Sequence, residues 1–196
     1  MAGVVRVVPT IAATKLGLVP LPLESSVALG AGVRLFRSAM PYSKTLDAEG
    51  EILRAWKELH EESRGLGGPG LCVVSTTPPD ELERLTDGRA SWDGMKAAGF
   101  HLVSAVIEKY DDDAYTAARN AVSEGLRWLA QDNAVLVSHC HSGFGRGSVV
   151  PSILLGKFSG LRSMEELLGQ LATIDDRMLP AAKEKPRAMV ATLLAE

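Results

Sequence analysis

The sequence predicts an α/β protein with a central, largely parallel sheet flanked by helices, in a single-domain arrangement. Short apolar runs bounded by turn residues alternate along the chain with longer segments of helical periodicity, which is typical of strands joined by helical crossovers. The 196 residues contain no long linker rich in glycine, serine or proline, so one core is expected. Residues 33–196 are expected to form this domain, and residues 1–32 an N-terminal extension or first strand packed on it.

The first elements follow from these patterns. Residues 4–8 form a short apolar run, and a proline-rich connection follows it. Residues 33–36 predict a strand, in which the alternation of apolar residues with Arg34 and Arg37 indicates a half-buried face. Apolar residues at helical spacing predict a helix over 46–64, which the glycine-rich segment that follows ends.

The middle of the chain predicts two further strands. Residues 71–75 are a short apolar strand, and the prolines and acids of 78–81 are suited to the start of a brief helix. Residues 101–107 predict another strand. The aspartates Asp111, Asp112 and Asp113 then precede a helix of about eighteen residues with apolar residues along one stripe.

A buried strand at 134–138 leads directly into the segment His139-Cys140-His141-Ser142-Gly143-Phe144-Gly145-Arg146. An apolar helix over 149–157 follows, and helices over 163–174 and 186–195 end the chain. In parallel sheets, ligands bind at the carboxyl ends of strands. The sequence therefore predicts a functional site at Cys140.

This loop combines the features that stabilise a thiolate. A helix N-terminus, inward-facing backbone N–H groups and a nearby cation all favour the ionised sulfur. The same N–H groups can hold the oxygens of a tetrahedral anion, and Gly143 and Gly145 allow the backbone to approach it closely. The planar fork of Arg146 can take two phosphate oxygens together. The expected phosphate-binding residues are His141, Ser142, Gly143, Phe144, Gly145 and Arg146.

The chemistry that this pattern indicates is the hydrolysis of a phosphate monoester. Cys140 attacks phosphorus, a phosphocysteine intermediate forms, and an activated water hydrolyses it. A carboxylic acid from elsewhere must protonate the leaving oxygen, and the run at 111–113 is its expected source. We favour Asp112 and then Asp111, and expect Asp113 to cap the following helix.

These residues resemble the signature of the protein tyrosine phosphatase superfamily, His-Cys, five residues and Arg, and most closely its small dual-specificity branch. The segment 37–41 is similar to the early Arg-Ser-x-x-Pro of those domains, and 73–82 to their strand and Pro-Asp-Glu turn. Tyr110-Asp111-Asp112 is similar to the general-acid loop of the phosphatases of regenerating liver. The resemblance implies a phosphocysteine mechanism on a phosphorylated protein or small phosphomonoester without metal or organic cofactor, and a supporting role for His139, which orders the loop by local hydrogen bonds.

Departures from the family pattern keep two alternatives open. The residue after the loop arginine, usually a Ser or Thr that eases departure of the thiolate, is Gly147, with Ser148 one place later. This favours, as one alternative, a phosphate-binding pseudophosphatase with impaired turnover. The other is a different thiolate enzyme, such as an arsenate reductase or a sulfurtransferase. Arsenate reduction would need a resolving thiol, for which Cys72 is the one candidate. Cys72 is otherwise expected to be a core residue.

The composition limits the kinds of binding partner and the compartment that are expected. A net charge of -3 and a pI near 5.8 give no basic surface for nucleic acid, and no apolar run is long enough for membrane insertion. The two cysteines are too few for a disulfide scaffold and indicate a reducing compartment, so we expect a cytoplasmic protein. His141 is expected at the pocket rim or exposed, and adjacent His139, Cys140 and His141 do not resemble a zinc site.

Overall fold

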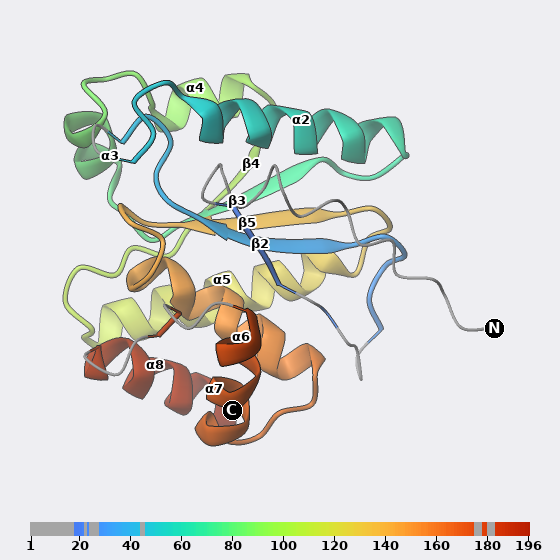
Figure 1. Ribbon diagram of the computed structural model, residues 1–196, viewed down its shortest axis with the longest axis vertical. Coiled ribbons are helices and arrows are strands. Elements are labelled where there is room, and N and C mark those ends of the chain that lie inside the picture. Colours follow the sequence, from blue (N-terminus) through green and yellow to red (C-terminus); the bar gives the residue numbers. More distant parts are fainter. Residues whose placement is uncertain (1–17, 22, 24–27, 44–45, 175–177, 180–182) are drawn as a thin grey trace.

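The computed structural model describes residues 18–21, 23, 28–43, 46–174, 178–179 and 183–196. The apolar run at 4–8, predicted as a first element, lies outside the described residues. Within them, strands and helices alternate along most of the chain, as the periodicity predicts (Figure 1).

The centre of the molecule is a five-stranded sheet with the strand order β1-β2-β5-β3-β4. Four neighbouring strands are parallel, and β1 is an antiparallel edge strand beside β2. The predicted largely parallel sheet is therefore confirmed. The strands are β1 (Val19–Leu21), β2 (Arg34–Ser38), β3 (Leu71–Ser75), β4 (His101–Ser104) and β5 (Val135–His139).

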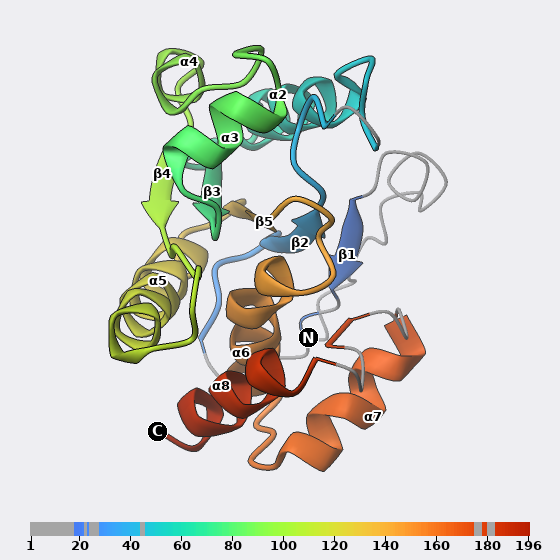
Figure 2. The same cartoon turned by 90° about the vertical axis from the view of Figure 1, so that its left-hand side faces the viewer.

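Helices cover both faces of the sheet (Figures 1 and 2). Strand β5 lies between β2 and β3, and its residues alternate between two apolar cores. Val135 and Val137 pack with Trp56 in the first core, whereas Leu136 packs with Leu154 in the second. The first face carries α2 (Glu51–Gly65), α3 (Pro79–Leu85) and α4 (Trp92–Ala97), and the second carries α5 (Asp112–Leu129), α6 (Val149–Phe158), α7 (Met164–Ile174) and α8 (Glu184–Ala195).

Two predicted boundaries are wrong for identifiable reasons. Helix α2 begins at Glu51, later than predicted, because the buried carboxylate of Asp47 accepts the backbone N–H groups of Ile52 and Tyr42 and holds the preceding residues in a turn. Strand β4 ends at Ser104. The chain beyond it still follows β3, since the N–H of Ile107 donates to the Thr76 carbonyl at 3.2 Å.

The start of α5 corrects the predicted helix cap. The carboxylate of Asp111, and not that of Asp113, accepts the N–H of Ala114 at 3.1 Å, so Asp111 is the N-cap. Asp112 and Asp113 are in the first helical turn, where their charges favour the positive helix end. The predicted length of eighteen residues is confirmed.

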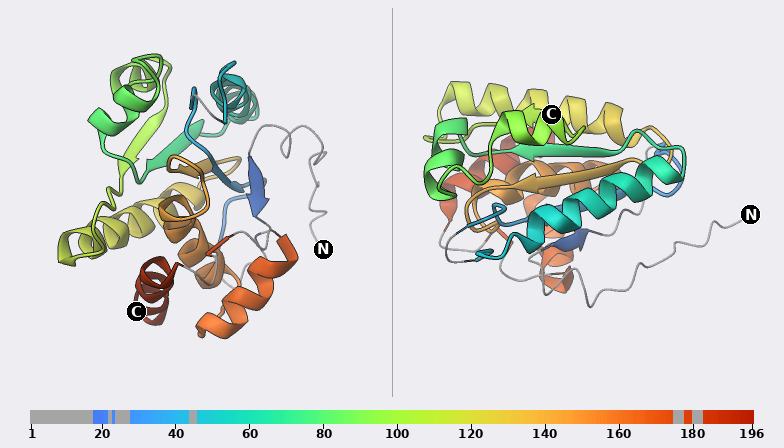
Figure 3. Two further views of the ribbon diagram at one scale, coloured as in Figure 1. Left: turned by 60° about the vertical axis from the view of Figure 1, so that its left-hand side comes forward. Right: turned by 90° about the horizontal axis from the view of Figure 1, so that it is seen from above.

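Strand β2 also departs from the sequence pattern. Arg37 was expected on a half-exposed strand face, but its side chain is only 1% exposed. Strand β2 is an inner strand, with β1 on one side and β5 on the other, and helices or loops cover both of its faces (Figure 3). Alternation then no longer separates buried from exposed positions. No helix in the described part of the chain is long and apolar enough to cross a membrane.

Candidate active site

The segment that follows β5 forms a loop at the carboxyl edge of the sheet. His139 is the last strand residue, and Arg146 opens a short 3-10 helix, η1 (Arg146–Ser148), which runs into α6. All five residues of β5 are buried, and the strand pairs in parallel with β2 and β3 along its length. Cys140 is therefore fixed to the most constrained strand of the sheet, at the edge where parallel sheets bind ligands.

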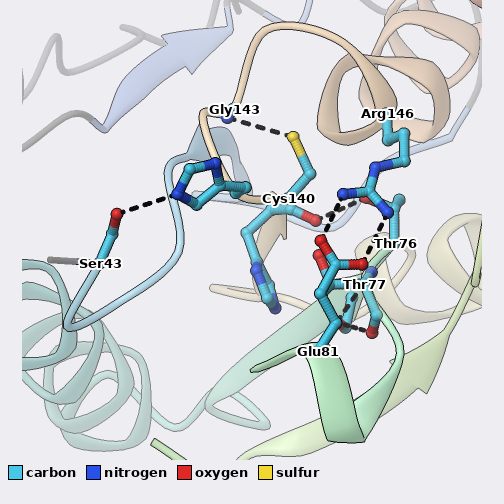
Figure 4. Close-up of polar contacts among 10 residues, drawn as sticks. Ser43, Thr76, Thr77, Glu81, Cys140, Gly143 and Arg146 are labelled. Atoms are coloured by element: carbon cyan, nitrogen blue, oxygen red, sulfur yellow. Dashed lines mark hydrogen bonds and ion pairs between the residues drawn. The ribbon is translucent and has the colours of Figure 1, made fainter. Parts of the chain in front are cut away.

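The Cys140 sulfur lies inside this loop (Figure 4). The backbone N–H of Gly143 donates to Sγ at 3.2 Å. Gly143 has a φ of 82°, and a Cβ at this position would lie 2.7 Å from the Ser38 carbonyl oxygen. Both the left-handed backbone and the close approach of β2 require glycine here, so the loop can close around the sulfur only with this residue.

Gly147 is the other close neighbour of the sulfur. A Cβ at this position would lie 3.2 Å from Sγ and 2.8 Å from the backbone nitrogen of Cys140. Ser148, which follows it, is fully buried and donates its hydroxyl to the carbonyls of Gly143 and Phe144, at 3.1 and 3.0 Å. The Ser148 hydroxyl is thus committed to the loop backbone, and position 147 presents no hydroxyl to the sulfur.

Arg146 is held by a carboxylate from the opposite side of the sheet. Its two terminal nitrogens donate to the two oxygens of Glu81 on α3, at 3.0 and 2.8 Å (Figure 4). The hydrogen bond to Arg146 is the main cause that lowers the pKa of Glu81, and the same bond raises the pKa of the arginine. A guanidinium has five N–H donors, and this pairing leaves the Nε–H edge for another anion.

We expect Glu81→Gln to weaken catalysis and anion binding by about tenfold, because an ionic bidentate pair becomes a single hydrogen bond from the guanidinium to a neutral amide oxygen. The pKa of Glu81 is lowered on folding, so its contribution to stability is present above about pH 4.3, the ordinary glutamate pKa. That contribution is lost as the pH falls through the lowered value. Acid unfolding of the two proteins measures this difference.

Glu83→Gln is the matched control, since Glu83 is an exposed glutamate on the same helix. This variant is expected to bind phosphate and to unfold in acid like the wild type. A Glu81→Gln protein with unchanged phosphate affinity would show that Arg146 does not depend on its carboxylate partner.

The histidines on either side of Cys140 differ in environment. His139 is fully buried, and the centre of its ring lies 5.3 Å from that of the Trp56 ring. Burial, and then the charge on Arg146, lower the pKa of His139 to about 4. A hydrogen bond with the Cys140 backbone acts in the opposite direction. The ordering of the loop by local hydrogen bonds of His139 stays a prediction.

His141 is half-buried, and its Nε2 lies 3.4 Å from the hydroxyl oxygen of Ser43. The carbonyl of His141 accepts the N–H of Met40 at 3.2 Å. These contacts join the first residues of the loop to the segment that follows β2. His141 therefore lies on the side of the loop that faces this segment.

The three aspartates suggested as a source of the general acid are exposed. Asp111 caps α5, and Asp112 lines a surface hollow with residues of α5 and α8, including Arg119 and Thr192. Tyr110, just before them, has a φ of 33° and is close enough to Cys140 and Arg146 for their charges to act on its hydroxyl. Burial is the main cause that raises the pKa of Tyr110 to about 12. The segment before α5 therefore borders the loop.

Cys72 is a core residue and is remote from the loop. It is fully buried in β3, and burial strongly raises the pKa of its thiol. Its partner in the sheet is Leu136, and Cys140 is four residues further along the same direction. At about 3.3 Å per residue, the two cysteines are separated by roughly 13 Å. A disulfide needs Cα atoms within about 7 Å, so this fold keeps the two thiols apart.

Two residues of the site were not predicted as members of it. Glu81 was interpreted as a favourable charge at a helix start, and Arg37 as a surface residue of a strand. Arg37 donates to the Gly143 carbonyl at 3.1 Å and lies 4.3 Å from the centre of the Phe144 ring. Both side chains reach the loop from positions far away in the sequence. They lie in the segments 37–41 and 73–82 that resemble the family pattern, and this resemblance was the signal that could have identified them.

Comparison with solved structures shows that several phosphatases share this fold. Kinase associated phosphatase is similar over 92% of this chain and 97% of its own, with a TM-score of 0.64 and 17% identity. The active form of Tk-PTP covers 88% and 96% of the two chains, with a TM-score of 0.51 and 20% identity. No protein-family model matches the sequence, and no curated protein has significant sequence similarity to it.

A third similar structure is PTPMT1 in complex with PI(5)P, with a TM-score of 0.53 and 14% identity over 82% of this chain and 92% of that one. The predicted dual-specificity-phosphatase-like fold is thus confirmed. At these identities the comparisons establish the architecture, and the arrangement around Cys140 carries the argument about chemistry.

Proposed function

We propose that this chain is a cysteine-dependent phosphatase that hydrolyses phosphotyrosine, and also phosphoserine or phosphothreonine, in proteins. One observation carries the proposal. The Cys140 sulfur accepts a hydrogen bond from a loop amide, and Arg146 is held beside the loop by Glu81. A nucleophile and a fork of donors for phosphate oxygens are thereby combined at the end of a buried strand. The loop has no lysine, which favours protein over phosphoinositide substrates.

The proposed reaction needs no metal or organic cofactor. The Cys140 thiolate attacks phosphorus while a carboxylic acid protonates the leaving oxygen, so that the P–O bond breaks as the P–S bond forms. Water then attacks the phosphocysteine, the same carboxylate takes its proton, and phosphate and thiolate are released. Two free cysteines, one of them the nucleophile, favour the reducing cytoplasm as the compartment.

The general acid is proposed to come from the connection between β4 and α5. Asp112 and Asp111 remain the candidates from the sequence, and the structure adds Glu108, which follows the buried Ile107 where the connection leaves β3. We expect one of Glu108→Gln, Asp111→Asn and Asp112→Asn to reduce turnover by about 10²-fold or more. The loss should be larger for an alkyl than for an aryl phosphate, because the poorer leaving group depends more on protonation.

Asp113→Asn is the control for this series, since Asp113 is exposed within the first turn of α5. The turnover rates of each variant on an aryl and on an alkyl phosphate identify the general acid. If all of these variants retained the wild-type preference between aryl and alkyl phosphates, the acid would not lie in this connection.

A second candidate function is a phosphate-binding module that turns over very slowly. The observation in its favour is that the Ser148 hydroxyl is donated to two loop carbonyls, while Gly147 leaves the sulfur without a neighbouring hydroxyl. Departure of the thiolate from phosphocysteine then has the Gly143 N–H as a donor to the sulfur but no hydroxyl donor. A rapid release of one equivalent of product, followed by negligible steady-state turnover, would identify this function. An arsenate reductase with Cys72 as resolving thiol is disfavoured by the separation of the two cysteines.

A further inference from the structure

The outer side of the Cys140 loop is held by two buried side chains. The hydroxyl of Ser148 donates to the carbonyl oxygens of Gly143 and Phe144, at 3.1 and 3.0 Å. Nη1 of Arg37 donates to the same Gly143 carbonyl at 3.1 Å. Ser148 is 0% and Arg37 is 1% exposed, so these carbonyls are directed into the protein.

The direction of a carbonyl group fixes the direction of the N–H group in the same peptide unit. In a trans peptide the C=O and the N–H of one unit point to opposite sides, and the described chain has no cis peptide bond. The Gly143 carbonyl shares its unit with the Phe144 N–H, and the Phe144 carbonyl shares its unit with the Gly145 N–H. Both N–H groups therefore point away from the buried donors Arg37 and Ser148, and Phe144 and Gly145 themselves are half-buried.

These peptide units need external support because glycines flank them. Gly143 and Gly145 lack the side chains that restrict backbone rotation, and a rotated unit would present a carbonyl oxygen to an anion. The Phe144 ring adds a further restraint, since it lies over the Arg37 guanidinium at 4.3 Å. Arg37 and Ser148 thus act on one short stretch of backbone from two elements, β2 and η1.

We propose that Ser148 and Arg37 are positioning residues that aim the Phe144 and Gly145 amides at a bound phosphate. This role rests on the proposed function for the nature of the ligand, and it differs from a role for Ser148 as a hydrogen-bond donor to the sulfur. Neither side chain touches the phosphate. Their effect is on how well the loop matches a tetrahedral anion before the anion arrives.

The test is the affinity of the protein for inorganic phosphate, measured by calorimetry together with the thermal unfolding midpoint. Ser148→Ala removes both carbonyl contacts and is expected to weaken phosphate binding by about tenfold, the size of a lost buried hydrogen bond. Ser148→Thr keeps the hydroxyl and is expected to retain most of the affinity. Arg37→Met is expected to weaken binding as well, and the double variant to lose less than the sum, because both residues hold the Gly143 carbonyl.

Ser152→Ala is the matched control. Ser152 is a fully buried serine on α6 whose hydroxyl has no hydrogen-bond partner among the described residues, and its alanine variant is expected to bind phosphate like the wild type. Wild-type affinity in Ser148→Ala would overturn the inference, as would an equal loss in Ser152→Ala. A wild-type protein that binds no phosphate would instead remove the proposed function, which separates the two failures.

Discussion

Cys140→Ser is expected to reduce hydrolysis of an aryl phosphate by about four orders of magnitude or more, as loss of a nucleophile does in other covalent enzymes. A serine hydroxyl at this position remains protonated, so it cannot replace the thiolate that the loop is built to hold. The exchange is nearly isosteric and Cys140 directly follows the buried strand β5, so the unfolding temperature should stay close to that of the wild type. Steady-state rates and thermal unfolding together test this.

Cys72→Ala is the control for the nucleophile. It removes the other cysteine of the chain, in the fully buried centre of β3, and is expected to lower the free energy of unfolding by about 1 to 2 kcal/mol through the cavity it leaves. Its turnover per folded molecule should equal that of the wild type. A fully active Cys140→Ser protein would show that the reaction does not proceed through Cys140. An inactive but folded Cys72→Ala protein would show that the reaction also requires the second thiol.

Arg146→Lys is expected to reduce kcat/KM by about 10²- to 10³-fold, the usual cost of removing a donor aimed at developing negative charge. Lysine keeps the positive charge but loses the planar fork. That fork bonds both oxygens of Glu81 in this structure, and its other edge can meet two phosphate oxygens together. A single ammonium group cannot make both bidentate contacts.

Arg84→Lys provides the comparison, because Arg84 is an exposed arginine on α3 whose charge also acts on Glu81. We expect this variant to have wild-type kcat/KM. If Arg146→Lys were equally active, charge alone would account for the arginine and the bidentate role would be excluded. If Arg84→Lys were as impaired as Arg146→Lys, the loss would not be specific to the guanidinium of Arg146.

The parts of the site that the sequence predicts are those encoded in consecutive residues. An apolar strand, a cysteine, two glycines and an arginine before a helix are contiguous in the chain, so their local geometry follows from their order. The central sheet is predictable for the same reason, because each strand is a short apolar run. Helix starts are less certain, since a shift of two residues separates the observed cap Asp111 from the expected Asp113.

The partners of the loop are not encoded locally. Glu81 precedes Arg146 by 65 residues and Arg37 precedes Gly143 by 106, so both contacts exist only once the sheet has brought β2, β3 and β5 together. An acid at a helix start and an arginine in a strand each have a common explanation without a site. Tertiary packing, and not residue type, decides which explanation applies.

The tight backbone around Gly147 has a consequence for how this protein can evolve. A serine or threonine at that position would place the new Cβ 2.8 Å from the Cys140 nitrogen. The backbone that carries the nucleophile must shift to accommodate it, so a hydroxyl can be gained at position 147 only together with changes in neighbouring residues.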